Sequence, residues 1–266
     1  MPDEPVSPAD RAWLLEQELG PEIRRVFRRV ADDRIGTGPI PASALVLYDP
    51  AFGPFHDNRD FLGFFTNEIL HQDTCSPSTA DGVEIVAWPA VDDRVPARNR
   101  MGLVEFLFAT GTVGERHTAT SWPDRPPHTN PAAEARAHRA VEAVVEDVFA
   151  RWDDECTAVR IALAQLAAAF PREAGPEAGH RVRALADRLR NSTASDYLDF
   201  AAVMIHGDNA AMAAAVEHYT GWEADYDFRG TLPDVPVRSR ALHLLDQMAE
   251  HEHIVLTALL RPEDRL

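Results

Sequence analysis

Glutamate and histidine residues lie on the apolar faces of several segments with helical spacing. In residues 237–260, placing side chains at 100° per residue gives one apolar stripe: Ala241, Leu245, Met248, Val255, Leu256 and Leu259. Glu252 falls at the centre of this stripe and His251 and His253 near its edges, whereas His243 falls on the polar side. A buried, unpaired carboxylate is too costly, so we expect Glu252 to be paired, protonated or bound to a metal.

Two further segments repeat this arrangement. In residues 57–71, Glu68 lies among the phenylalanines of the apolar face, and His71 follows one turn later, so the two side chains can converge. The long segment after Pro131 carries an apolar stripe that, extended backwards, passes through His138 and Glu134. Three predicted helices therefore each present a glutamate and a nearby histidine.

Glutamates and histidines that converge from several helices are typical of dimetal carboxylate sites in helical bundles. Oxygen and imidazole ligands suit iron or manganese, and the metal offsets the buried negative charge. The sequence thus predicts a non-haem iron or dimetal oxygenase or oxidase acting on a small organic substrate. Glu68 and Glu252 are the predicted catalytic carboxylates. The predicted metal ligands are Glu68, His71, Glu134, His138, Glu252 and His253, with Asp208 as a further candidate.

Three other functions are compatible with the same residues. The first is a haem-dependent oxygenase with His71 or His206 as axial ligand. The second is a metal-free enzyme that condenses or cyclises a small substrate, with a buried glutamate as general base. The third is a non-catalytic acidic protein that binds a basic partner. A haem absorption band, the metal content and activity without metal would separate these alternatives.

Each candidate residue also has a purely structural explanation. Glu68 and Glu252 can form buried pairs with arginines, and a glutamate in the first turn of a helix, such as Glu134, favours the helix dipole. His206 precedes a glycine and fits a helix C-terminus, and Asp208 fits an N-cap.

The overall pattern predicts an all-α, single-domain helical bundle. Residues 1–56 form an N-terminal helix and arm, and residues 57–266 form the core bundle. Residues 72–130 are the exception: we expect an irregular or partly extended segment there, including a strand near 84–88 and a long loop over 111–130 that covers the site. Asn130 and Pro131 favour a helix start, and the helical pattern then runs to Phe170 with a break near residues 153–154. Further helices are predicted, with these bounds: 177–190, 194–206, 209–220 and 237–260.

The amino-acid composition excludes some classes of binding partner. The net charge of −17 argues against binding to nucleic acid or to an anionic membrane surface, because both reward a basic face. No Gly-rich phosphate loop, Cys-x-x-Cys pair or Gly-x-Ser-x-Gly elbow is present. With two cysteines and no apparent signal peptide, the sequence predicts a cytoplasmic protein with free thiols and a small-molecule substrate, and it leaves a homodimer open.

Overall fold

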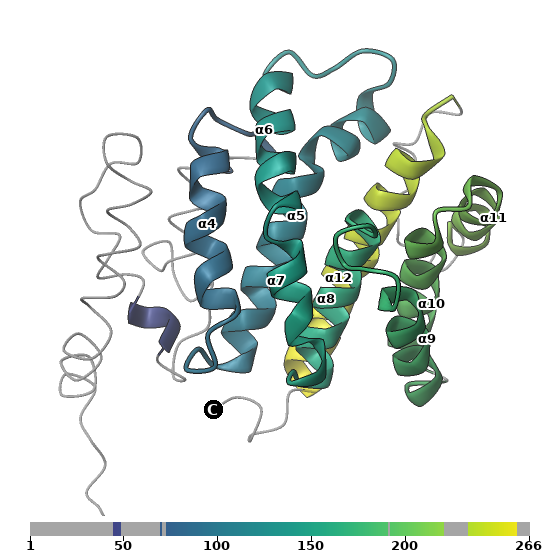
Figure 1. The fold of residues 1–266 in the computed structure, drawn as a ribbon. Coiled ribbons are helices and arrows are strands. Elements are labelled where there is room, and N and C mark those ends of the chain that lie inside the picture. The colour runs from purple at the N-terminus through teal and green to yellow at the C-terminus, as the bar shows by residue number, and fades with distance from the viewer. Residues whose placement is uncertain (1–44, 49–69, 71–72, 191, 221–233, 260–266) are drawn as a thin grey trace, which may run out of the picture.

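The protein is an all-α bundle (Figure 1). The computed structural model describes residues 45–48, 70, 73–190, 192–220 and 234–259, with side chains in the last helix described to Ala249. No strand occurs among these residues. The helical elements are η1 (Leu45–Tyr48), α4 (Thr79–Ala90), α5 (Ala97–Ser121), α6 (Pro131–Glu142), α7 (Val145–Ala150), η3 (Arg151–Asp153), α8 (Thr157–Ala169), α9 (Ala178–Arg188), α10 (Thr193–His206), α11 (Asn209–Tyr219) and α12 (Val237–Leu259).

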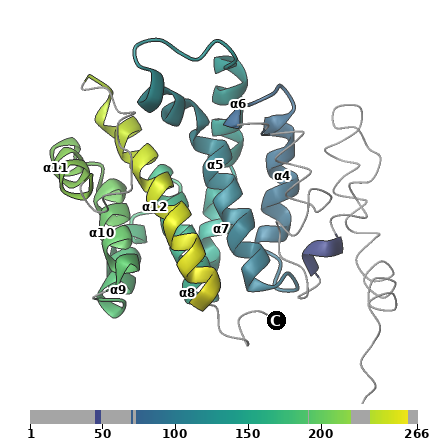
Figure 2. The same cartoon turned by 180° about the vertical axis from the view of Figure 1, so that it is seen from behind.

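Helix α5 is the central element, because it packs against α4, α6, α8 and α12. Helices α9 and α10 pack on each other, and α10 joins them to the rest of the bundle through α8 and α12. Both views place α4 and α11 at opposite sides of the bundle, with α12 running along one face between them (Figures 1 and 2).

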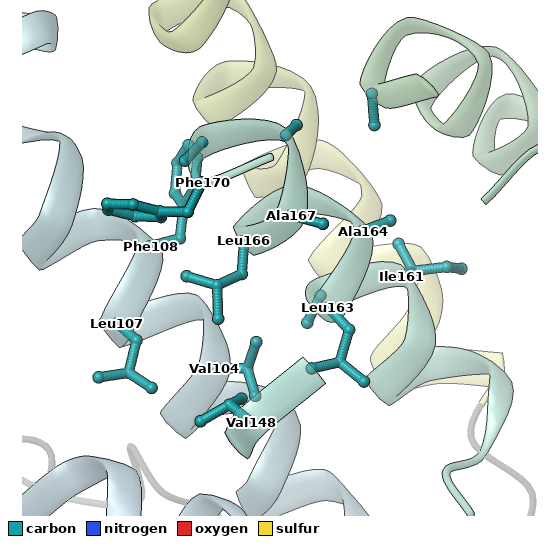
Figure 3. Packing of buried hydrophobic residues seen from close by; sticks show 14 of the residues in the cluster. Val104, Leu107, Phe108, Val148, Ile161, Leu163, Ala164, Leu166, Ala167 and Phe170 are labelled. Atoms are coloured by element: carbon teal, nitrogen blue, oxygen red, sulfur yellow. The ribbon is translucent and has the colours of Figure 1, made fainter. Parts of the chain in front are cut away.

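A large apolar contact of the core lies where the first half of α5 meets α8. Val104, Leu107 and Phe108 of α5 face Leu166 and Phe170 of α8 and its C-cap, as Figure 3 shows. All five side chains are at most 2% exposed. Burying a large apolar side chain stabilises the fold by about 1.5–3 kcal/mol, so this contact fixes the position of α5.

Several helices from α6 onward begin or end at the capping residues that the sequence indicates. The Asn130 side chain accepts a hydrogen bond from the Ala133 amide, with Pro131 as the first residue of α6. Gly207 ends α10 with a positive φ of 69°, and Asp208 then caps α11 by accepting from the amides of Ala210 and Ala211. These ends confirm the predicted starts and stops, including the structural explanation of Asp208.

The path from Pro131 to Phe170 bends twice. The break expected near residues 153–154 is present, where η3 and the turn after it separate α7 from α8. A second break at residues 143–144, between α6 and α7, was not expected.

The prediction of an irregular or partly extended segment over residues 72–130 is wrong for α4 and α5, and it is right for the non-helical connection at 122–130. Residues 84–88 belong to α4 rather than to a strand, and residues 111–121 complete α5 rather than begin a loop. Helix α5 is buried on nearly all sides, so it lacks the one-sided apolar stripe that marks a surface helix. Its glycines and threonines further weaken the helical signal.

Two other predictions lie outside the described residues, apart from η1 and Leu70: the N-terminal helix and arm, and the helix at 57–71. The division of the chain at residue 56 therefore stays a prediction. Among the described helices, none combines the length and the apolar character that crossing a bilayer requires.

Candidate functional site

A pocket of about 340 Å³ lies between the second half of α5 and the start of α6. Charged and titratable side chains line its walls. The lining residues are Gly114, Glu115, Thr118, Arg125, Pro131, Glu134, Ala135, His138 and Arg139. Two of the predicted site residues, Glu134 and His138, therefore share one pocket.

Glu134 is a buried carboxylate with both oxygens occupied. Its side chain is 3% exposed; Arg125 Nη1 donates to Oε2 at 2.6 Å, and His117 Nδ1 lies 3.1 Å from Oε1. Gly114 makes room for this group, because a Cβ at that position would lie 3.2 Å from Oε2. Glu134 does occupy the first turn of α6, but it is buried rather than solvated, and Arg125 balances its charge.

His138 lies one turn after Glu134, and a backbone contact fixes its tautomer. Nδ1 is 2.8 Å from the Gly111 carbonyl oxygen, which can only accept, so Nδ1 carries the proton. In the neutral ring, Nε2 is then the acceptor. The ring also packs on Phe170, with centroids 4.9 Å apart. His138 is thus held in an orientation that suits either a proton acceptor or a metal ligand.

The connection between α5 and α6 supplies the outer wall. Arg125 reaches Glu134 from this connection although its own side chain is 43% exposed. The His128 ring stands edge-on to His117, with centroids 6.2 Å apart. His117 belongs to α5 and not to a loop. The expectation that these residues cover a site at Glu68 and Glu252 stays a prediction, because those two side chains lie outside the described residues.

A second polar group, the Arg116 cluster, lies on another side of α5. Arg116 forms a two-point ion pair with Asp73 at 2.8 and 2.5 Å, and it contacts Asp246 of α12 at 3.2 Å. It also donates to the Ala109 carbonyl. Burial disfavours the guanidinium charge, but Asp246 and Asp73 outweigh it and raise the pKa of Arg116. Asp73 has φ of 60°, a left-handed conformation that Asp tolerates better than most residues.

Cys75 lies within electrostatic reach of both groups. Burial raises the pKa of its thiol to about 12, and the negative charges of Glu134 and Asp73 add to this effect. Thiolate is the reactive form of cysteine, so Cys75 is a poor nucleophile here.

His243 of α12 lies beside the Arg116 cluster. The sequence placed it on the polar side of its helix, but the structure half-buries it. Burial lowers the pKa of His243, the Arg116 charge lowers it further, and Asp73 partly opposes them. Gln247 Nε2 lies 3.2 Å from His243 Nε2.

The remaining predicted site residues are not placed. Glu68 and His71 lie outside the described residues, and Glu252 and His253 belong to α12 beyond the last described side chain. The register of α12 agrees with the predicted stripe as far as Met248, since Ala241, Leu245 and Met248 are buried. Within the described part of the chain, no group of three His, Cys, Asp or Glu side chains could hold a metal ion.

Two other candidates have the predicted structural positions: Asp208 caps α11, and His206 lies exposed in the last turn of α10. Sequence reasoning missed Arg116, Arg125, Glu115 and Arg139. An arginine among the small and apolar residues of α5 was a signal for Arg116. No pattern in the sequence marks the other three.

No protein-family model, curated protein or solved structure matches this chain.

Proposed function

We propose that this protein is an enzyme that removes a proton from a small molecule bound between α5 and α6, as the first step of a condensation or cyclisation. The observation that carries the proposal is the fixed tautomer of His138. Its Nδ1–H is committed to the Gly111 carbonyl while the ring lines a pocket, which leaves Nε2 as proton acceptor.

Glu134 is a weaker candidate for the base. Oε2 already accepts from Arg125 and Oε1 already contacts His117, so neither oxygen is open to a substrate proton. In this proposal Glu134 forms the pocket wall one turn from His138 and keeps its ion pair with Arg125. The Gly111 carbonyl continues to accept from Nδ1 when Nε2 takes a proton.

The test compares wild type with His138→Gln and with His180→Gln, a control at an exposed histidine of α9. Each protein is incubated with a cell-extract metabolite mixture in D₂O, and mass spectrometry follows loss of compounds and uptake of deuterium. We expect wild type and the control to convert the same compound, and His138→Gln to convert it about 10²–10⁴-fold more slowly. A conversion rate in His138→Gln equal to that of wild type contradicts the proposal. A larger loss of rate in Glu134→Gln would mean that Glu134, and not His138, is the base.

A metal-dependent oxygenase or oxidase is the second candidate. It is favoured because Glu134 and His138 line one pocket, and because a metal-binding histidine commonly donates its other nitrogen to a carbonyl, as His138 does. Glu68, His71, Glu252 and His253 would then supply the remaining ligands. Arg125 already neutralises Glu134, however, so burial of this carboxylate does not require a metal.

Metal content separates the two candidates. Under the second candidate, the purified protein contains about one or two iron or manganese ions per chain, and Arg125→Gln binds metal more tightly because it frees a Glu134 oxygen. Under the first, His138-dependent conversion persists after metal has been removed by chelation. The absorption spectrum of the same sample tests the haem alternative.

A further inference from the structure

Two opposite charges line the pocket without pairing with each other. Arg139 of α6 and Glu115 of α5 both contribute to its walls. Neither side chain forms a hydrogen bond or an ion pair with another described residue. The other two charged residues of the wall, Glu134 and Arg125, pair with each other. Among the described residues, the pocket therefore offers one cationic and one anionic side chain that no direct contact engages.

Each charge has a structural role that does not require a ligand. Arg139 lies in the last turn of α6, where a cation favours the helix dipole. Glu115 lies close enough to Arg238 of α12 to oppose the effect of burial, which lowers the pKa of that arginine. Neither role explains why the two residues contact the same cavity. A ligand with a single charge would be attracted by one of them and repelled by the other.

We propose that the pocket binds a small zwitterion, with its anionic group on Arg139 and its cationic group on Glu115. The carbon skeleton then lies along the uncharged part of the wall at Gly114, Pro131 and Ala135. The volume of about 340 Å³ is at the lower end of ligand pockets, so the zwitterion is the size of an amino acid. This inference rests on the proposed function, since it names the substrate class of the same site.

The probes are linear amino acids of increasing charge separation: glycine, β-alanine, 4-aminobutyrate, 5-aminopentanoate and 6-aminohexanoate. Each is paired with its N-acetyl form, which lacks the cation, and its amide, which lacks the anion. Binding to the full chain is measured by ligand-observed NMR. We expect at least one parent compound to bind and both of its blocked forms to bind about ten-fold or more weakly, as loss of a charge-assisted contact predicts.

Two variants assign the charges. Arg139→Gln should weaken the parent compound and leave its amide unaffected, whereas Glu115→Gln should weaken the parent and leave its N-acetyl form unaffected. Arg188→Gln is the matched control, because Arg188 is also an exposed arginine in the last turn of its helix. It should bind as wild type does.

The inference is overturned if no parent compound binds, if the blocked forms bind equally well, or if Arg188→Gln has the effect of Arg139→Gln. Failure of the proposed function looks different. Zwitterion binding that obeys the charge rules, with conversion that does not depend on His138, contradicts the proton-transfer role alone. His138-dependent conversion of a compound that is not a zwitterion contradicts the substrate class alone.

Discussion

The two halves of helix α5 differ in what they contact, although they form one continuous helix. The first half presents Val104 and Leu107, both at most 1% exposed, to α8 (Figure 3), and near its start it carries a buried ion pair between Arg100 and Glu155. The second half carries Arg116 and His117, which are also buried but bind carboxylates from three other segments of the chain.

This difference shows how the bundle carries polar groups in its interior. Ion pairs in a low-dielectric interior contribute little net stability, because desolvation offsets their attraction. Apolar packing of the first half therefore supplies most of the free energy that holds α5 in place. The second half is then free to position the pocket and the Arg116 cluster.

The largest expected effect concerns the reactivity of the Cys75 thiol, which is buried beside the polar half of α5. In Cys156→Ser, where Cys75 is the remaining thiol, alkylation of the folded protein at pH 8 should be at least about a thousand-fold slower than in the urea-unfolded chain. The reason is the pKa rise from 9.0 to about 12, which lowers the thiolate fraction by about that factor. Iodoacetamide labelling followed by mass spectrometry measures both rates. Comparable rates would mean that the polar half of α5 is open to water, and the contrast between the halves would disappear.

The next effect concerns the apolar half. Leu166→Ala should lower the free energy of unfolding by about 3 kcal/mol, because Leu166 is fully buried and points from α8 toward α5 (Figure 3). Leu189→Ala, at the half-buried C-cap of α9, is the control and should lose about 1 kcal/mol. Urea titration followed by circular dichroism measures both. Equal losses would show that the α5–α8 contact is not the main support of α5.

A smaller loss is expected in the Arg116 cluster. Arg116→Met should cost about 2 kcal/mol, less than breaking a fully buried pair, because the Asp73 side chain left behind is 41% exposed and partly solvated. Arg190→Met removes an exposed pair with Asp187 and should change stability by less than about 0.5 kcal/mol. A loss larger than that of Leu166→Ala would reverse the ranking of the two halves.

The smallest effect is the pH dependence caused by His243. Its folded-state pKa lies below the ordinary value of 6.5, so the unfolded chain binds this proton more readily than the folded chain. The stabilisation is therefore complete above about pH 6.5 and is lost as the pH falls toward the folded-state value. The charged groups that act on the ring are Arg116, which Asp246 also contacts, and Asp73, and Gln247 lies 3.2 Å from Nε2.

His243→Gln should reduce the loss of stability between pH 6.5 and 5, whereas His180→Gln at an exposed site should not. Thermal unfolding across this pH range measures the slope for each variant. An unchanged slope in His243→Gln would place the titrating group elsewhere.

Sequence reasoning recovered the helices that have local signals. Asn130, Gly207 and Asp208 mark their helix ends by chemistry that depends on a few neighbouring residues. Helices α4 and α5 lack such marks: no side chain caps their starts, and they are buried on most sides. Their helical state is determined by the surrounding bundle, which a single sequence does not display.

The residues of the candidate site also fall into those that local spacing predicts and those that only tertiary contacts bring together. Glu134 and His138 were found because helical spacing places them on one face of one helix. Arg125 joins them because the α5–α6 connection folds back over the pocket, and Glu115 joins them because α5 packs on α6. Contacts between segments of this kind depend on tertiary structure, and no periodicity predicts them.

Gly111 connects the core to the candidate chemistry. A Cβ at this position would lie 2.7 Å from Cζ of Phe170 and 3.1 Å from Cγ1 of Val141, and its own carbonyl orients His138. In most helix interiors, alanine in place of glycine is favourable by about 0.5–1 kcal/mol. Here the added methyl group would push Phe170 against the ring that it packs on and turn the imidazole away from its carbonyl. Gly111→Ala, a change that is usually made for stability, would therefore displace His138 without altering any residue that lines the pocket.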